Sequence, residues 1–316
     1  MRDYVRNVMH LINFIRTTGS VSTTVLALYS LTPEAHAHGF EGDRFFPPTI
    51  TTDDPFAVDE FAFPTISVFN NPAEGSTPKT RQIDISSEFD KEIFPKFALG
   101  IVADYTIFQP QGQTTRTGFD NLTLSAKYTL FENAPHEFIF SVGGEFDVGG
   151  TGSTLVGRES FGTLTPTIYL GKGLGDLPDA LKVLKPFAVT GTLGYVIPGE
   201  TVDPNALSWG IAVEYSLPYL QEHVQEVDWL RPFRNAIPLV EFSMNSPLNH
   251  GGGETTGTIN PGVLWETRYC QIGAEALIPV NRATGPNVGA IVQVWIYIDD
   301  IWPKIFGFPV FGGEPK

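Results

Sequence analysis

The chain repeats a two-residue alternation between apolar and polar side chains. In QIDISSEFDKEIFPKFALGIVADYTIF (residues 82–108), Ile83, Ile85 and Phe89 alternate with polar neighbours, and after a turn at 92–96 the alternation resumes from Leu99 to Ile107. Successive side chains of a β-strand point to opposite faces, so a period of two indicates strands with one apolar and one polar face.

The same pattern returns along the chain and predicts about twelve strands. They lie around residues 61–69, 82–89, 99–107, 121–130, 137–148, 163–170, 187–197, 207–217, 240–245, 260–266, 271–278 and 288–298. Many run about 11 to 14 residues, whereas strands of globular proteins centre on roughly 5 to 6. Tilted strands of that length can cross a bilayer.

The connections between these strands fall into two alternating classes. One class is rich in Gly, Thr and Asn, as in NNPAEGSTPKT and PLNHGGGETT, and the other includes KEIFPK and ENAPH. LPDALKVLK and PYLQEHVQEVDWL, also of the second class, each fit a short amphipathic helix at the inner rim. Alternating loop chemistry favours an all-β fold, a transmembrane antiparallel up-and-down β-barrel over residues 61–299.

Three prolines test this interpretation. Pro166 and Pro261 fall inside expected strands, and Pro238 lies near the start of another. Proline has no N–H to donate to a sheet, and a closed barrel has no free edge. We therefore expect each of them at a bulge or a strand end.

The two ends of the chain look different from the barrel region. Residues 1–37 read as a signal peptide, with three arginines, a short apolar core VSTTVLALYSL and a small-x-small site at 35–37. An N-terminal anchoring helix is the alternative, but the core is too short to span a bilayer. Residues 38–60 form a periplasmic extension or a plug that folds into the lumen. Residues 300–316 form a C-terminal tail.

Composition removes several classes of protein. The net charge is −15, and an acidic surface is unsuited to binding nucleic acid. Cys270 is the single cysteine, which excludes an internal disulfide framework and a cysteine-based zinc site. Beyond the leader, no apolar run approaches the roughly 18 residues of a transmembrane helix.

Two features of the chain resemble a known family. They are the start of the expected mature chain, HGFEGDRFFPPTITTDDPFAVDEF, and strands such as NLTLSAKYTLFENAPHEFIFSVGGEFDVGGTG. Both resemble the bacterial outer-membrane family of meta-pathway phenol-degradation transporters. The resemblance covers most of residues 38–300 and implies an outer-membrane location and an aromatic solute. One departure is that the chain continues past its last expected strand, so the tail either caps the periplasmic mouth or the terminal strand lies later.

In such a barrel the apolar face contacts lipid and the polar face lines the interior. The inward candidates are mostly acidic and would favour cations: Asp84, Glu88, Asp104, Lys127, Glu137, Glu145, Asp147, Glu214, Glu241, Glu266 and Glu275. The alternative is that they form hydrogen-bonded ladders in a plugged barrel, because twelve strands enclose little open space.

Neither a cofactor nor a metal site is expected. His38, His136 and His223 are weak metal candidates because their spacing matches no ligand motif. An enzyme is not expected either, since no nucleophile with a positioned base can be named. His250, beside Glu254, belongs to a glycine-rich loop.

The sequence therefore predicts an outer-membrane channel or facilitator for passive uptake of small solutes. Cationic solutes follow from the inward carboxylates, and aromatic solutes follow from the resemblance alone. The expected partners are outer-membrane lipid and a small-molecule solute. One alternative is a non-conducting scaffold barrel that holds a periplasmic protein partner. A second is a secreted soluble β-sandwich.

Overall fold

The computed structural model describes residues 39–73, 78–249 and 252–312. All of them belong to one compact unit, Ala37–Lys316. The expected signal peptide, His38 and His250 lie outside the described residues.

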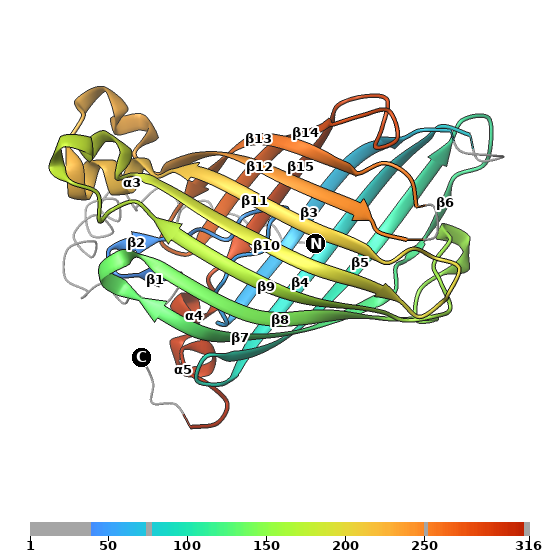
Figure 1. Ribbon diagram of the computed structural model, residues 1–316, viewed down its shortest axis with the longest axis horizontal. Helices are drawn as coiled ribbons and strands as arrows, with labels where there is room; N and C mark the ends of the chain where they lie inside the picture. The colour runs from blue at the N-terminus through green and yellow to red at the C-terminus, as the bar shows by residue number, and fades with distance from the viewer. Residues whose placement is uncertain (1–38, 74–77, 250–251, 313–316) are drawn as a thin grey trace, which may run out of the picture. The chain divides into compact units, whose positions relative to one another are not determined.

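Twelve long antiparallel strands form a closed barrel (Figure 1). They are β3 (Glu60–Asn71), β4 (Thr80–Phe94), β5 (Phe97–Pro110), β7 (Leu122–Asn133), β8 (Phe138–Val148), β9 (Thr163–Gly173), β10 (Phe187–Pro198), β11 (Ala206–Tyr215), β12 (Ala236–Pro247), β13 (Thr256–Glu266), β14 (Cys270–Pro279) and β15 (Gly289–Ile296).

Each long strand pairs with its neighbours in the chain, and β3 pairs with both β4 and β15. The ring is therefore closed, which rules out the two separate sheets of a sandwich. A thirteenth, short strand, β6 (Arg116–Phe119), pairs with β5. The sequence placed this stretch in a loop, because four residues are too few to establish an alternation.

The outer surface of the barrel is apolar along the strands. Its exposed side chains include Leu99, Ile101, Leu124, Phe146, Leu164, Ile168, Leu193, Ile211, Val263, Ile272 and Val292. A closed barrel satisfies its backbone hydrogen bonds within the protein, and an apolar outside suits it to hydrocarbon. The chain is a transmembrane β-barrel of the outer-membrane type.

No described helix is long and apolar enough to cross a bilayer.

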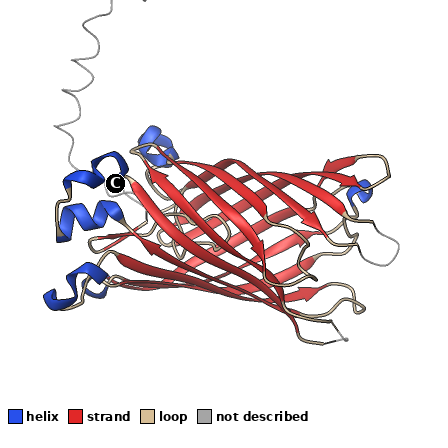
Figure 2. Cartoon of the chain, turned by 90° about the horizontal axis from the view of Figure 1, so that it is seen from above, coloured by secondary structure: helices blue, strands red, loops and turns tan. Residues whose placement is uncertain are grey.

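The two ends of the barrel carry different structures (Figure 2). At one, here called the helical end, lie η2 (Ala134–His136), η4 (Asp179–Leu184), α3 (Leu217–Tyr219), η5 (Leu220–Val224), η6 (Asp228–Phe233), α4 (Ile298–Ile301) and α5 (Pro303–Phe306). The other, the polar end, has the Gly- and Thr-rich loops and one short turn, η3 (Thr154–Val156). Helical turns thus form at both stretches for which short helices were predicted.

The prolines are accommodated differently from the prediction. Pro166 pairs with Gly144 inside β9, and Pro261 pairs with Val240 inside β13. On the other side of each strand, the pairing skips the proline and resumes in the same register. Neither residue lies at a bulge or a strand end, so that expectation was wrong for both. A local gap in one ladder is sufficient, because proline removes only one donor. Pro238 does lie near the start of β12.

Candidate functional site

The most extensive contacts inside the barrel are made by residues 39–59, here called the lumen segment. It begins near the helical end with a small hairpin, β1 (Phe40–Glu41) and β2 (Arg44–Phe45) (Figure 1). It then contacts inward-facing side chains of β7 and β8 on one wall and of β12, β13 and β14 on the opposite wall. The lumen segment therefore lies across the interior of the barrel.

Arg44 fastens the start of the lumen segment to three connections at the helical end. Its guanidinium is fully buried and bonds the Glu137 carboxylate at 3.2 Å. It also donates to the carbonyl oxygens of Pro186, at 3.1 Å, and Lys185, and stacks 3.7 Å from the centre of the Tyr219 ring. A buried charge with this many partners is stabilising only while all of them are in place.

Glu137 completes this cluster from the wall side. It accepts hydrogen bonds from the Gly175 amide at 2.8 Å and from the Tyr219 hydroxyl at 3.0 Å. Burial, together with the nearby Glu137 carboxylate, raises the pKa of Tyr219 to about 12, so this hydroxyl stays protonated and donates. Arg44, Glu137 and Tyr219 are referred to below as the latch.

Glu241 holds the middle of the lumen segment. Its carboxylate accepts the backbone N–H groups of Ile50 at 2.7 Å, Thr51 at 3.0 Å and Thr52 at 2.5 Å. It also accepts the Thr51 hydroxyl at 2.9 Å. Successive N–H groups that converge on one anion form a nest, and the low dielectric of the interior strengthens these bonds. Asn260 adds a bond to the Thr51 hydroxyl from the adjacent strand.

Lys127 binds the acidic part of the lumen segment from the opposite wall. Its ammonium group lies 2.8 Å from an Asp53 carboxylate oxygen and 2.9 Å from the Asp54 carbonyl oxygen. It also lies 4.9 Å from the centre of the Tyr169 ring, within cation–π range. The one clear base predicted on the inward face is therefore neutralised by the segment itself.

The interior also has small apolar patches, all towards the helical end. Phe46 and Phe56 pack against Ile139 of β8, and Ile50 packs against Ile237 and Leu264. These wall residues point inward although they are apolar. They allow the lumen segment to bury its apolar side chains against a wall that is otherwise lined by polar side chains.

The remaining predicted residues lie on the wall, and the bonds described for them are to other wall residues or to Tyr297. Asp84 accepts from Gln82 at 2.8 Å and Thr106 at 2.7 Å, and Asp147 accepts from Thr123 at 2.6 Å. Asp84 and Asp147 therefore belong to hydrogen-bonded ladders, as the alternative prediction of a plugged barrel expects. Glu266 accepts the Tyr297 hydroxyl.

The other five predicted carboxylates differ in burial and in position on the wall. Both carboxylate oxygens of Glu214 and of Glu275 are buried and accept no hydrogen bond within the described residues. Glu145 is exposed on the lumen side of β8. Glu88 and Asp104 occupy the neighbouring strands β4 and β5.

Lys127, Glu137 and Glu241, which bind the lumen segment, were among the predicted inward residues, but sequence reasoning missed Arg44, Tyr169 and Tyr219. Arg44 is the sole base between residues 39 and 60, which was the available signal that it needs a partner. Tyr169 and Tyr219 carried no signal, because a tyrosine in a strand or a helical turn is ordinary.

The two weak metal candidates within the described residues, His136 and His223, make separate contacts. His136 lies 3.0 Å from Asp176, which also binds Lys172, and the ring centre of His223 lies 4.6 Å from that of Tyr219. Among residues 39–73, 78–249 and 252–312, no three histidine, cysteine or acidic side chains are placed to hold a metal ion.

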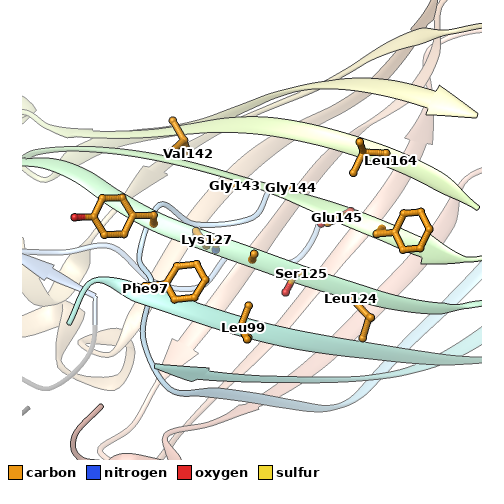
Figure 3. A pocket seen from close by; sticks show the side chains of 13 residues that line it. Phe97, Leu99, Leu124, Ser125, Lys127, Val142, Gly143, Gly144, Glu145 and Leu164 are labelled. Atoms are coloured by element: carbon orange, nitrogen blue, oxygen red, sulfur yellow. The ribbon is translucent and has the colours of Figure 1, made fainter. Parts of the chain in front are cut away.

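A shallow apolar groove of about 560 Å³ lies on the outer face of β5, β7, β8 and β9. Small residues, Ala126 and Gly144, leave space between larger ones such as Leu99, Leu124 and Leu164. Figure 3 shows Leu99, Leu124 and Leu164 on the near side of the sheet, with Lys127 and Glu145 behind it. The groove and the lumen contacts thus occupy opposite faces of the same strands.

No family model matches the chain, and no curated protein matches it. Among solved structures, it is similar to the COG4313 outer membrane channel from Pseudomonas putida F1, with 12% identity, a TM-score of 0.49 and coverage of 79% of this chain and 99% of that one. It is also similar to the KdgM porin in complex with disordered oligogalacturonate, with 11% identity, a TM-score of 0.43 and coverage of 76% and 98%.

A third similar structure is outer membrane phospholipase A from Escherichia coli, with 10% identity, a TM-score of 0.37 and coverage of 77% and 97%. Channels and an enzyme thus appear among similar structures, at TM-scores that carry no functional conclusion for this chain.

We expect Arg44→Met to loosen the lumen segment. Removing one partner of a buried charge pair costs about 3–5 kcal/mol, so the protection of residues 39–47 in hydrogen exchange should fall by about two orders of magnitude or more. Lys185→Met is the matched control, because its side chain pairs with the exposed Asp179 and exposed ion pairs contribute little to stability. Equal protection in both variants would contradict the role of the latch.

We also expect docking of the lumen segment to weaken as pH rises. Burial, with the nearby Glu132 carboxylate, raises the pKa of Glu41 from 4.5 to about 7, against the opposing charge of Lys96. The docked state therefore binds this proton more tightly, so its stabilisation is complete below pH 4.5 and is lost as pH rises through 7.

Exchange protection of residues 39–47, corrected for intrinsic rates, should be about tenfold lower at pH 8 than at pH 5. Glu41→Gln should flatten this dependence. A slope that is unchanged in Glu41→Gln would assign the effect to another group.

Proposed function

We propose that the protein is a non-enzymatic outer-membrane channel for small solutes whose lumen is occupied by its own N-terminal segment. The observation that carries the proposal is the set of bonds from residues 44–59 to both walls. A solute that crosses the barrel has to pass this segment. Either the segment moves during transport, or the solute uses a narrow path beside it.

The charge of the accessible wall supports small cations as solutes. Glu145 is exposed to the lumen, Asp147 neighbours it, and Lys127 is neutralised by Asp53. Rings of carboxylates at a constriction favour cations over anions. The resemblance to meta-pathway phenol-degradation transporters is the reason to test aromatic solutes as well.

The alternative of a non-conducting scaffold also has a specific observation in its favour. Glu241 alone accepts four hydrogen bonds from Ile50, Thr51 and Thr52, which is more than a readily displaced segment needs. In that case the helical end, with the latch, would be the face that holds a periplasmic protein.

A disulfide trap separates the two functions. A Cβ atom built on Gly210 would lie 2.9 Å from the Thr52 hydroxyl oxygen and 3.1 Å from its methyl carbon, so cysteines at these positions are within disulfide reach. In a Cys270→Ser background, we expect Thr52→Cys/Gly210→Cys to show lower single-channel conductance when oxidised than when reduced.

The two single-cysteine variants serve as controls and should not respond to reductant. Equal conductance in both redox states would show that solutes pass a fixed segment. An absence of conductance in the wild type and in the reduced variant would favour the scaffold.

Neutralising an accessible carboxylate should change ion selectivity more than neutralising a buried one. We expect Glu145→Gln to lower the cation-to-anion permeability ratio by about twofold or more, because this charge faces the lumen. Glu214→Gln is the matched control, since Glu214 is only 1% exposed. Reversal potentials in a salt gradient measure the ratio, and equal effects of the two substitutions would place Glu145 away from the ion path.

A further inference from the structure

The C-terminal tail leaves the barrel at the helical end and returns along the outer side of β4. Tyr297 and Ile298 are buried directly after β15. After α4 and α5, the chain extends alongside the end of β4. There the Val310 amide donates to the Glu92 carbonyl at 3.1 Å and the Phe311 amide to the Ile93 carbonyl at 2.8 Å. Lys91 adds a bond to the Phe308 carbonyl at 2.8 Å. The tail is therefore fixed to the barrel.

Aromatic rings join the tail to the apolar outside of the barrel. The ring centre of Phe306 lies 6.1 Å from that of Phe89, which in turn lies 6.5 Å from Phe61. Phe311 lies 5.4 Å from Phe94. These wall residues belong to the apolar surface that faces lipid, so the tail continues that surface past the ends of β3, β4 and β5.

Several apolar side chains of the tail are turned outward. Trp302 is 52% exposed, Ile305 61% and Phe311 58%. The ring centre of Trp302 lies 6.3 Å from that of Phe306. An exposed tryptophan beside aliphatic and aromatic neighbours, at the border of an apolar belt, matches the chemistry of the bilayer interface.

We propose that residues 301–311 form an interfacial membrane anchor that rests on the lipid leaflet at the helical end. The partner that this anchor contacts is the boundary between lipid headgroups and acyl chains. Trp302, Ile305 and Phe311 enter that boundary, and the backbone bonds to Glu92 and Ile93 set their depth. The proposal holds whether the barrel conducts or serves as a scaffold.

The test uses the full-length protein in phosphatidylcholine vesicles that contain brominated lipid. The fluorescence of Trp302 is obtained as wild type minus Trp302→Phe, which removes the contribution of the other tryptophans. We expect stronger quenching by bromines near the headgroup than by bromines near the chain ends, and little quenching by aqueous iodide. Strong iodide quenching without bromolipid quenching would overturn the proposal.

A double variant tests the other two side chains. Ile305→Ser/Phe311→Ser should reduce the bromolipid quenching of Trp302 by about half or more, because the apolar area that holds the tail in the interface is lost. Val202→Ser, at a 77% exposed position on the polar end, should leave it unchanged. Unchanged quenching in the double variant would contradict the anchor.

A second measurement applies if the double variant does not fold. A nitroxide on Lys304→Cys in the Cys270→Ser background should be more accessible to oxygen than to a water-soluble nickel chelate. The reverse order would place the tail in water and overturn the proposal.

Discussion

A chain that crosses hydrocarbon has no water to satisfy its backbone, and this constraint governs the rest of the structure. Each long strand finds partners on both sides, and the pairing of β3 with β15 closes the ring. Closure leaves no edge to protect. Pro166 and Pro261 are tolerated within the closed sheet because each interrupts only one ladder for a short stretch, and the register on both sides is kept.

Closure creates a second problem, which lies inside. Twelve strands enclose a narrow space lined by polar and charged side chains, and such groups are costly to bury without partners. The lumen segment supplies many of those partners: Arg44 for Glu137, three backbone amides for Glu241 and Asp53 for Lys127. Structure at the centre of the barrel thus depends on residues that precede its first strand.

Alternation made the strands predictable, because an apolar outside and a polar inside leave a period of two in the sequence. It was less informative about the interior. Ile139, Ile237 and Leu264 point inward, since the lumen segment provides apolar contacts there. Pairs such as Lys127 with Asp53 are separated by 74 residues, and no local pattern encodes such a distance. For the tail the sequence allowed two interpretations, a cap on the periplasmic mouth or a later terminal strand. Neither of them predicted that the tail would return along the outside of β4.

The nest around Glu241 has a consequence for assembly. Its amide donors come from Ile50, Thr51 and Thr52, and the carboxylate of Glu241 lies 191 residues after Ile50 in the chain. The N–H groups at residues 50–52 are synthesised before any strand of the barrel wall, yet their acceptor is in place only when β12 has joined the wall. A contact this distant in sequence forms late in folding, because the entropy of closing the intervening loop has to be overcome first. The first part of the barrel unit to be made is therefore expected to become ordered only after the strands that supply its acceptors.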